Sequence, residues 1–305
     1  MFLSPSTPSR FRAVILALAV FITAGCEEAV GPTLEDSAQF TLYGALDPEA
    51  ESQLVRVFAI RDRLEETEAG LVNATMTTTD LATGEVVVWR DSVITLANGR
   101  SGDAFVAAFT PAFGRTYQVV VEGETGEPAT VVVDVPPDIE PILRTPTFGV
   151  NGAAQEVLWP GVARLNAARV EIDFFSTECR RYTFELTEDI AAPIDFGWTV
   201  NVPFGVVATQ VRNVFDVPAS QLAITAVRVE ARVASRDWVP PGGVFDPDVL
   251  IEPGTFSNVT NGFGFVGASY PSSTRWLPSS EVAVRSGFLP NGGTGCAAAA
   301  PSQTD

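Results

Sequence analysis

The most constraining feature of this sequence is a series of short stretches rich in Val, Phe, Tyr and Thr, separated by turn-forming residues. β-Branched and aromatic residues favour strands, and Gly, Pro, Asn or Asp between them favours turns. The first stretches are FTLYGAL (40–46), LVRVFAI (54–60), GEVVVWR (84–90), AFVAAF (104–109), TYQVVVE (116–122) and ATVVVDV (129–135). No window of a dozen residues beyond Gln39 has the periodicity of an amphipathic helix. We therefore predict an all-β fold.

The pattern resumes after a proline-rich connector, VPPDIEP (135–141), which favours a stiff boundary between domains. The later stretches are RVEIDFF (169–175), RYTFELT (181–187), GWTVNVPFGVVATQV (197–211) and ITAVRVEARVAS (224–235), with ASQLA (219–223) as a candidate helical turn. Six or seven strands in about a hundred residues are typical of an immunoglobulin-like sandwich. We predict two such β-sandwich domains, at 38–138 and 139–290; one continuous β body with a boundary near residue 140 is the alternative.

The first residues predict export and lipidation. Arg10 and Arg12 precede an apolar run at 13–22, which is too short for a membrane-spanning helix of roughly 20 residues but fits a signal peptide. TAGC (23–26) follows and resembles the lipobox of bacterial lipoproteins, although Thr23 stands where Leu is usual. The resemblance implies a signal peptide at 1–25 and a mature chain that begins at lipidated Cys26. An ordinary signal peptide would need an A-x-A site, and none lies at the right place.

Lipidation implies a location at a membrane. Each buried methylene contributes about 0.8 kcal/mol, so two or three acyl chains on Cys26 would hold the protein permanently. Glu27 and Glu28 begin an acidic tether at 26–37. In surface lipoproteins of the Bacteroidota such acids act as an export signal, and a plain solvated tether is the other interpretation. We predict anchoring at the outer membrane, on its periplasmic or its cell-surface face.

The charge balance argues against nucleic acid as a partner. The 305 residues include 37 acids and 19 Arg, with no Lys and no His. Without residues 1–25 the chain keeps 17 Arg against 37 acids, a formal charge of −20. It has no basic face to displace counterions from phosphates or to dock on anionic lipid. A hydrated, self-repelling surface and a salty habitat both explain this composition.

The absence of His and Lys also limits the chemistry. It excludes Ser-His-Asp and Cys-His catalysis, Schiff-base lysines, imidazole zinc sites and a P-loop lysine. Carboxylate chemistry survives, as in a glycosidase pair or a Ca²⁺ site. Asp246, Asp248 and Glu252 are candidate Ca²⁺ ligands in FDPDVLIEPG (245–254), which lacks the spacing of an EF-hand; a solvated loop is the plainer interpretation. We predict no cofactor and no catalytic residues.

Two cysteines remain besides Cys26. Cys179 and Cys296 either form a disulfide, which an exported protein permits, or stay as two free thiols. A bond would contribute about 4–5 kcal/mol in the chain-entropy model. It would also pin the Gly/Ala-rich end of the chain, because we predict a disordered tail at 291–305.

Residues 256–269, FSNVTNGFGFVGAS, contain the spacing G-x-G-x-x-G at Gly262, Gly264 and Gly267. A dinucleotide-binding fingerprint needs a helix after the third glycine. Here ASYPSSTRW follows, and its proline and serines disfavour a helix. We predict no nucleotide binding. Instead, we expect a strand whose glycines let another backbone or an aromatic ring approach closely; a loop that approaches a ligand is the alternative.

The same segment resembles the C-terminal signature of a family of uncharacterised Bacteroidota lipoproteins, typed as a domain of unknown function. The family's pattern is N-[IV]-x-[NG]-G-x-G-x-[FV]-G-[AG], and it is matched by Asn258, Val259, Asn261, Gly262, Gly264, Val266, Gly267 and Ala268. LYGALDPEAESQLVRV (42–57) is similar to the family's opening strand pair, and ATVVVDVPPDI (129–139) resembles the end of its first domain. The resemblance implies an outer-membrane location, sometimes beside receptors that import nutrients, and no known reaction.

These observations lead to a hypothesis of function. Trp238 (SRDWVPPGG) and Trp276 (SSTRWLP) lie in loop-like contexts and are candidates for rings that face a ligand such as a glycan; core packing is the plainer interpretation. We expect a non-catalytic lipoprotein that binds a nutrient or polymer, or assists an import receptor. A carboxylate-dependent glycan hydrolase and a structural envelope or adhesion module are the alternatives. Exposed aromatic rings in a groove would favour binding, and paired acids about 5–10 Å apart would favour hydrolysis.

Overall fold

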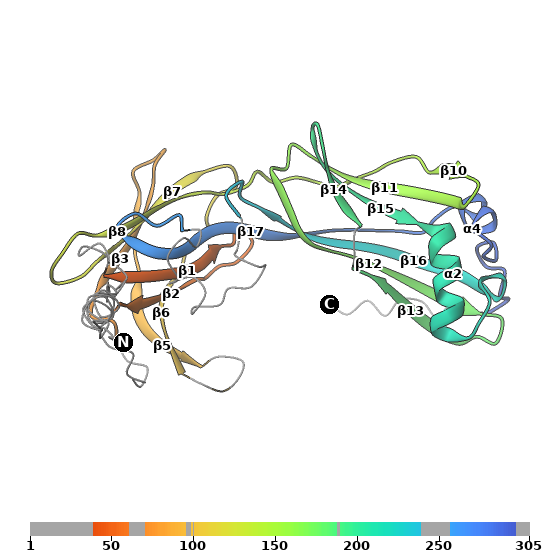
Figure 1. Cartoon of the computed structure of the whole chain (residues 1–305), viewed down its shortest axis with the longest axis horizontal. Helices are drawn as coiled ribbons and strands as arrows, with labels where there is room; N and C mark the ends of the chain where they lie inside the picture. Colours follow the sequence, from red (N-terminus) through yellow and green to blue (C-terminus); the bar gives the residue numbers. More distant parts are fainter. Residues whose placement is uncertain are drawn as a thin grey trace, which may run out of the picture. The chain divides into compact units, whose positions relative to one another are not determined.

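The computed structural model describes residues 39–60, 71–95, 99, 101–187, 190–238 and 257–296 (Figure 1). The described strands form three sheets within one compact unit, so the predicted all-β fold is confirmed. The signal peptide and the whole acidic tether, including Cys26, lie outside the described residues.

The largest sheet has eight strands in the order β13-β12-β16-β17-β1-β2-β6-β5. Their bounds are, in that order, Arg181–Leu186, Arg164–Ser176, Leu222–Ala234, Gly262–Trp276, Phe40–Leu46, Gln53–Ala59, Ser101–Ala107 and Arg90–Thr95. Burial alternates along β2 and through the RVEIDFF part of β12, as their charged and apolar residues predict. Each of these strands therefore turns one face to a core and one to water.

A four-stranded sheet, β4-β3-β7-β8, covers one part of the large sheet. Its strands are Val86–Val88, Thr75–Asp80, Thr116–Glu122 and Ala129–Asp134. The first core contains side chains from β1, β2 and β6 together with Met76 and the inward residues of β7 and β8. This is a sandwich arrangement, in which the alternate residues of two facing sheets share one core. Trp89 is buried in this core and donates from Nε1 to Thr78 Oγ1 at 2.8 Å.

A second small sheet has the order β10-β11-β15-β14, with β9 also paired to β11. The bounds are Thr147–Gly149, Gly152–Pro160, Gly197–Pro203, Ala191–Ile194 and, for β9, Ile142–Leu143. The second core joins this sheet to β12, β13, β16 and part of β17, and it includes residues of two helices.

Strand β17 contributes to both cores. Its first part pairs in parallel with β1, from Phe40↔Gly262 to Leu46↔Ala268, and its second part pairs with β16 in antiparallel register (Figure 1). Val266 belongs to the first core and Tyr270 to the second. The large sheet therefore continues across the boundary that the sequence predicts at residue 138.

The glycines of β17 permit this close packing. Gly264 has φ +98°, and a Cβ added to it would lie 2.1 Å from Leu42 O. A Cβ on Gly267 would lie 2.7 Å from the ring of Phe265. The expectation of a tightly packed strand, approached by a backbone and by an aromatic ring, is confirmed. A strand to Trp276, and no helix, follows the third glycine.

The helices correct part of the sequence analysis. The predicted strand at 197–211 ends at Pro203, and the helix α2 (Phe204–Phe215) follows. The β-branched residues of this segment favoured a strand in the sequence. In the structure, Phe204, Val207 and Val211 form the buried face of the helix. The turn at ASQLA is the 3₁₀ helix η1 (Ala219–Gln221), as predicted. The short helix α4 (Ser280–Arg285), which the sequence analysis missed, is capped by Ser279, whose side chain accepts from the N–H of Val282.

The proline-rich connector has no regular secondary structure and is held by Tyr270. The Tyr270 hydroxyl donates to Pro137 O at 2.8 Å and accepts from the N–H of Ile139 at 3.1 Å. Burial raises the pKa of Tyr270 above its ordinary value, so the phenol stays protonated and remains a donor. The connector is thus fixed to the strand that both cores share.

A disulfide bond joins Cys179 to Cys296, with the two Cα atoms 5.6 Å apart. It fixes the start of the predicted disordered tail, where residues 291–294 form turns. The prediction of a tail that begins at residue 291 is therefore corrected for residues 291–296. Residues 297–305 lie outside the described residues.

We expect Gly264→Ala to lower the free energy of unfolding by about 3 kcal/mol or more, because the new Cβ would be strained and would also displace β1. Urea unfolding of the purified protein measures this. Gly84 is the matched control, since it has φ +74° and nothing within 4 Å of an added Cβ. Gly84→Ala should lose only about 1–2 kcal/mol, and equal losses in the two variants would contradict close packing at Gly264.

Replacing both Cys179 and Cys296 by Ser should lower the free energy of unfolding by up to about 4–5 kcal/mol, because the bond joins residues 117 positions apart. Urea unfolding with and without reductant measures this effect. In the unmodified protein, mass spectrometry should detect one bond between these cysteines; two free thiols would contradict it.

Candidate ligand-binding clefts

The first cleft, here called the Phe196 cleft, has a volume of about 450 Å³ and lies on the β10-β11-β15-β14 sheet. It is formed by β11, by the turn between β14 and β15, and by Arg144, which follows β9. The turn carries Asp195 and Phe196 to the rim and ends at Gly197. Gly197 has φ +145°, and a Cβ there would lie 2.1 Å from Trp159 O, so only glycine lets the hairpin close this way.

Phe196 is 52% exposed and presents an aromatic ring in this cleft. The Arg144 guanidinium lies 5.7 Å from the ring centroid, and Arg144 Nη1 lies 3.7 Å from Glu156 Oε2. Both side chains of this ion pair are nearly half exposed, so the pair contributes little to stability, at most about 1 kcal/mol. The cleft therefore combines an exposed aromatic ring with a cation, a hydroxyl at Thr199 and the carboxylates of Glu156 and Asp195.

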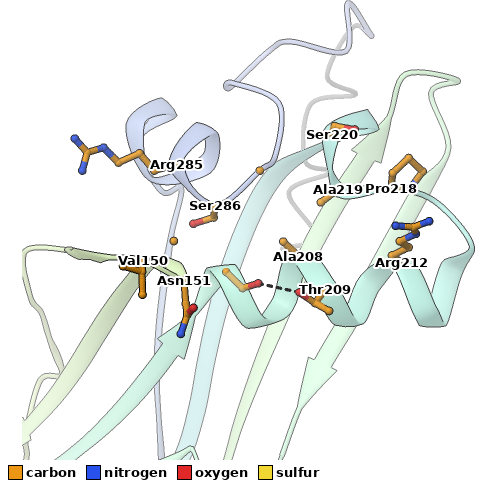
Figure 2. A pocket seen from close by; sticks show the side chains of 13 residues that line it. Val150, Asn151, Ala208, Thr209, Arg212, Pro218, Ala219, Ser220, Arg285 and Ser286 are labelled. Carbon is orange, nitrogen blue, oxygen red and sulfur yellow. Dashed lines mark hydrogen bonds between the residues drawn. The ribbon is translucent and has the colours of Figure 1, made fainter.

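The second cleft, here called the Arg212 cleft, has a volume of about 580 Å³ (Figure 2). Its lining comes from the turn between β10 and β11, one side of α2, the segment around η1, and the end of α4. The residues of α2 that face the cleft follow the helical spacing; they are Gly205, Ala208, Thr209 and Arg212. An adjacent side of α2, with Phe204, Val207 and Val211, is buried in the second core.

Backbone contacts determine the shape of the Arg212 cleft. A Cβ on Gly205 would lie 1.4 Å from Asn151 O, so the β10–β11 turn packs directly against the start of α2. Gly152 has φ +97° and an added Cβ would lie 3.2 Å from the Cα of Ser286. The Ser286 Oγ accepts from the N–H of Ala153 at 3.0 Å, which ties α4 to the same turn.

The two arginines of this cleft have different surroundings. Arg285 pairs with Glu281 at 3.4 Å and its guanidinium lies 4.5 Å from the ring centroid of Phe148; Figure 2 shows it directed away from the cleft. For the Arg212 guanidinium, the described residues provide no ion pair, hydrogen bond or stacked ring. No Asp or Glu lines this cleft among the described residues.

The structure corrects the two tryptophan candidates. Trp238 is only 9% exposed and packs edge-on against Phe265, with ring centroids 5.4 Å apart. Trp276 packs against the second core and donates from Nε1 to Gln155 Oε1 at 3.0 Å. Neither ring lines a described cleft. The loop-like neighbours of both residues in the sequence led to the wrong prediction. Trp276 is the last residue of β17, and Trp238 packs against that strand.

Other predicted site residues lie outside the described residues. These are Cys26 and the candidate Ca²⁺ ligands Asp246, Asp248 and Glu252. Within the described ranges, no cluster of three or more His, Cys, Asp or Glu has the arrangement of a metal site. The same ranges contain no helix long and apolar enough to cross a membrane.

Sequence reasoning did not identify Phe196 or Arg212. The only local signal for Phe196 was its place in IDFGW (194–198), beside a glycine at the start of a predicted strand. Arg212 gave no signal, because the helix that directs it to a cleft was taken for a strand.

Comparisons with known proteins assign no family. No protein-family model matches the sequence, and no curated protein does. The crystal structure of the pullulanase from Anoxybacillus sp. LM18-11 is similar over 62% of this chain and 24% of the pullulanase, with 11% identity and a TM-score of 0.21. Its complex with maltotriose has the same coverage and identity and a TM-score of 0.20. This chain spans about a quarter of the pullulanase, and a likeness this low carries no argument about function.

Proposed function

We propose that this protein is a lipid-anchored, non-catalytic lipoprotein of the outer membrane that binds a glycan at the Phe196 cleft. The supporting observation is the exposed Phe196 ring beside Arg144, Glu156 and Asp195. The apolar C–H face of a sugar packs on an aromatic ring, and its hydroxyls bond to nearby charged groups. A glycan held in this way would be a nutrient that the lipoprotein retains or passes to an import receptor.

The anchoring part of the proposal depends on the sequence of the first 28 residues. TAGC (23–26) follows a short apolar run, and the two glutamates after it match the acidic export signal of surface lipoproteins. A lipid anchor combined with a water-exposed binding cleft would keep a soluble polymer close to the membrane.

A glycan hydrolase is the second candidate, because Glu156 and Asp195 share the Phe196 cleft. A glycosidase needs one carboxyl group held in an apolar pocket, where burial makes it a general acid near neutral pH. Glu156 is instead 44% exposed and paired with Arg144, and Asp195 lies on an exposed turn. These surroundings favour hydrogen bonding to sugar hydroxyls over bond cleavage.

We expect Phe196→Ala to weaken glycan binding about tenfold, because a lost stacking contact of about 1.4 kcal/mol corresponds to that factor. Detergent-solubilised protein is screened against soluble starch, xylan, galactan and mixed-linkage β-glucan, and calorimetry then gives Kd for the strongest binder. Phe148→Ala is the matched control: Phe148 is 39% exposed, lies under Arg285 and is outside both clefts.

Two results would contradict glycan binding at this site: no affinity for any of these polymers, or equal effects of the two Phe substitutions. The hydrolase would be established instead if the unmodified protein released reducing sugar. This activity would also have to be lost in Glu156→Gln and in Asp195→Asn.

Replacement of Cys26 by Ser should move the protein from the membrane fraction to the soluble fraction, because the lipid attachment site would be lost. Fractionation of cells and immunoblotting measure this change. Cys296→Ser changes a cysteine that we do not expect to be lipidated, so that variant should stay with the membrane. Membrane retention of the Cys26 variant would rule out the anchor.

A further inference from the structure

The Arg212 cleft has a distinct electrostatic character within a strongly acidic protein. The chain has 37 acidic residues and 19 Arg, and two arginines on the central strands of the large sheet are each paired with acids. Arg169 lies beside Glu230 and Glu185, and Arg228 lies beside Glu171 and Glu230. Arg212, by contrast, lines a cleft that has no carboxylate among its described lining residues.

Neither Asp216 nor Glu281 forms an ion pair with Arg212. Asp216 ends α2 and bonds through its backbone N–H to Arg212 O, but no ion pair joins the two side chains. Glu281 is paired with Arg285 on the other side of the cleft. The Arg212 guanidinium is therefore an exposed cation that a negatively charged ligand can reach without displacing a protein carboxylate.

The remaining polar groups of the cleft suit the same kind of ligand. Figure 2 shows Thr209 and Ser220 on the same side of the cleft as Arg212, with Asn151 and Ser286 opposite them. Hydroxyl and amide groups bond to neutral parts of a ligand, while a guanidinium binds a carboxylate or sulfate through two parallel N–H donors. The volume of about 580 Å³ is in the range of pockets for small ligands.

A purely structural role for Arg212 makes a different prediction. A cation in the last turn of a helix interacts with the helix dipole and stabilises the helix by about 0.3–1 kcal/mol. That role needs no cleft and affects only stability. Binding and unfolding measurements on one variant therefore separate the two roles.

We propose that the Arg212 cleft is a second binding site, which takes the carboxylate or sulfate group of a short acidic oligosaccharide. Arg212 binds the oxyanion, and Thr209, Ser220 and Asn151 bind the sugar hydroxyls. The site is separate from the Phe196 cleft in its residues and in the charge of its ligand, so the failure of one proposal does not remove the other.

Calorimetry tests this with trigalacturonate, a sulfated galactotriose, neutral galactotriose and inorganic sulfate as separate titrants of the solubilised protein. We expect one of the two acidic oligosaccharides to bind, galactotriose to bind at least tenfold more weakly, and Arg212→Gln to weaken the acidic ligand at least tenfold. Arg212→Lys should keep part of the affinity, because the charge stays and the planar pair of donors is lost. Phe196→Ala should leave this affinity unchanged.

Arg180→Gln is the control for charge alone, because Arg180 is exposed, pairs with Glu178 and lies outside both clefts. Equal weakening by Arg180→Gln and Arg212→Gln would overturn the proposal. So would the absence of binding by both acidic oligosaccharides, or binding of inorganic sulfate as tight as that of the sulfated sugar. A loss of stability in Arg212→Gln without a loss of affinity would assign Arg212 to the helix alone.

Discussion

The close approach of β17 to β1 at Gly264 is the contact on which both halves of the structure depend. Parallel pairing joins residue 40 to residue 262, so the large sheet can form only when distant parts of the chain meet. Any side chain at position 264 would clash with the Leu42 carbonyl. The same strand then continues into the second core through Tyr270, which also fixes the connector between the halves. Long-range pairing of this kind is slow to form, because loop closure precedes the contacts that stabilise it. The first core is thus incomplete until the C-terminal strand is in place.

The second half of the structure carries both clefts, and β11 connects them. Gly152 at its start borders the Arg212 cleft, and Glu156 lines the Phe196 cleft roughly 13 Å further along the strand, at about 3.3 Å per residue. One face of β11 packs on the second core, so its backbone is held in place while turns at either end carry the exposed groups. This is the usual division between a rigid scaffold and loops that bind. The two proposed sites would therefore lie at different positions along β11.

Charge distinguishes the two clefts. In the Phe196 cleft the cation of Arg144 is already paired with Glu156, so the aromatic ring is the main surface open to a ligand. In the Arg212 cleft the guanidinium of Arg212 has no ion-pair partner among the described residues, and no aromatic ring is among the described lining residues. Several arginines of the described residues form no ion pair, so Arg212 is distinguished by its cleft, whose described lining contains no carboxylate.

The sequence by itself determined the β class, most strand positions, the proline-rich connector and the tight packing of the strand at 262–268. These features depend on the strand preference of individual residues and on the alternation of apolar and polar residues, and both can be read from consecutive residues. It did not reveal α2, because Phe204, Val207 and Val211 belong to a helix only through their contact with the second core. It also placed Trp238 at the surface, although Trp238 is only 9% exposed and packs edge-on against Phe265 of β17. The clefts were decided entirely by tertiary structure: Phe196 depends on a turn that closes against Trp159, and Arg212 on a helix packed against Asn151. Such contacts join residues that are distant in the sequence, and no local pattern records them.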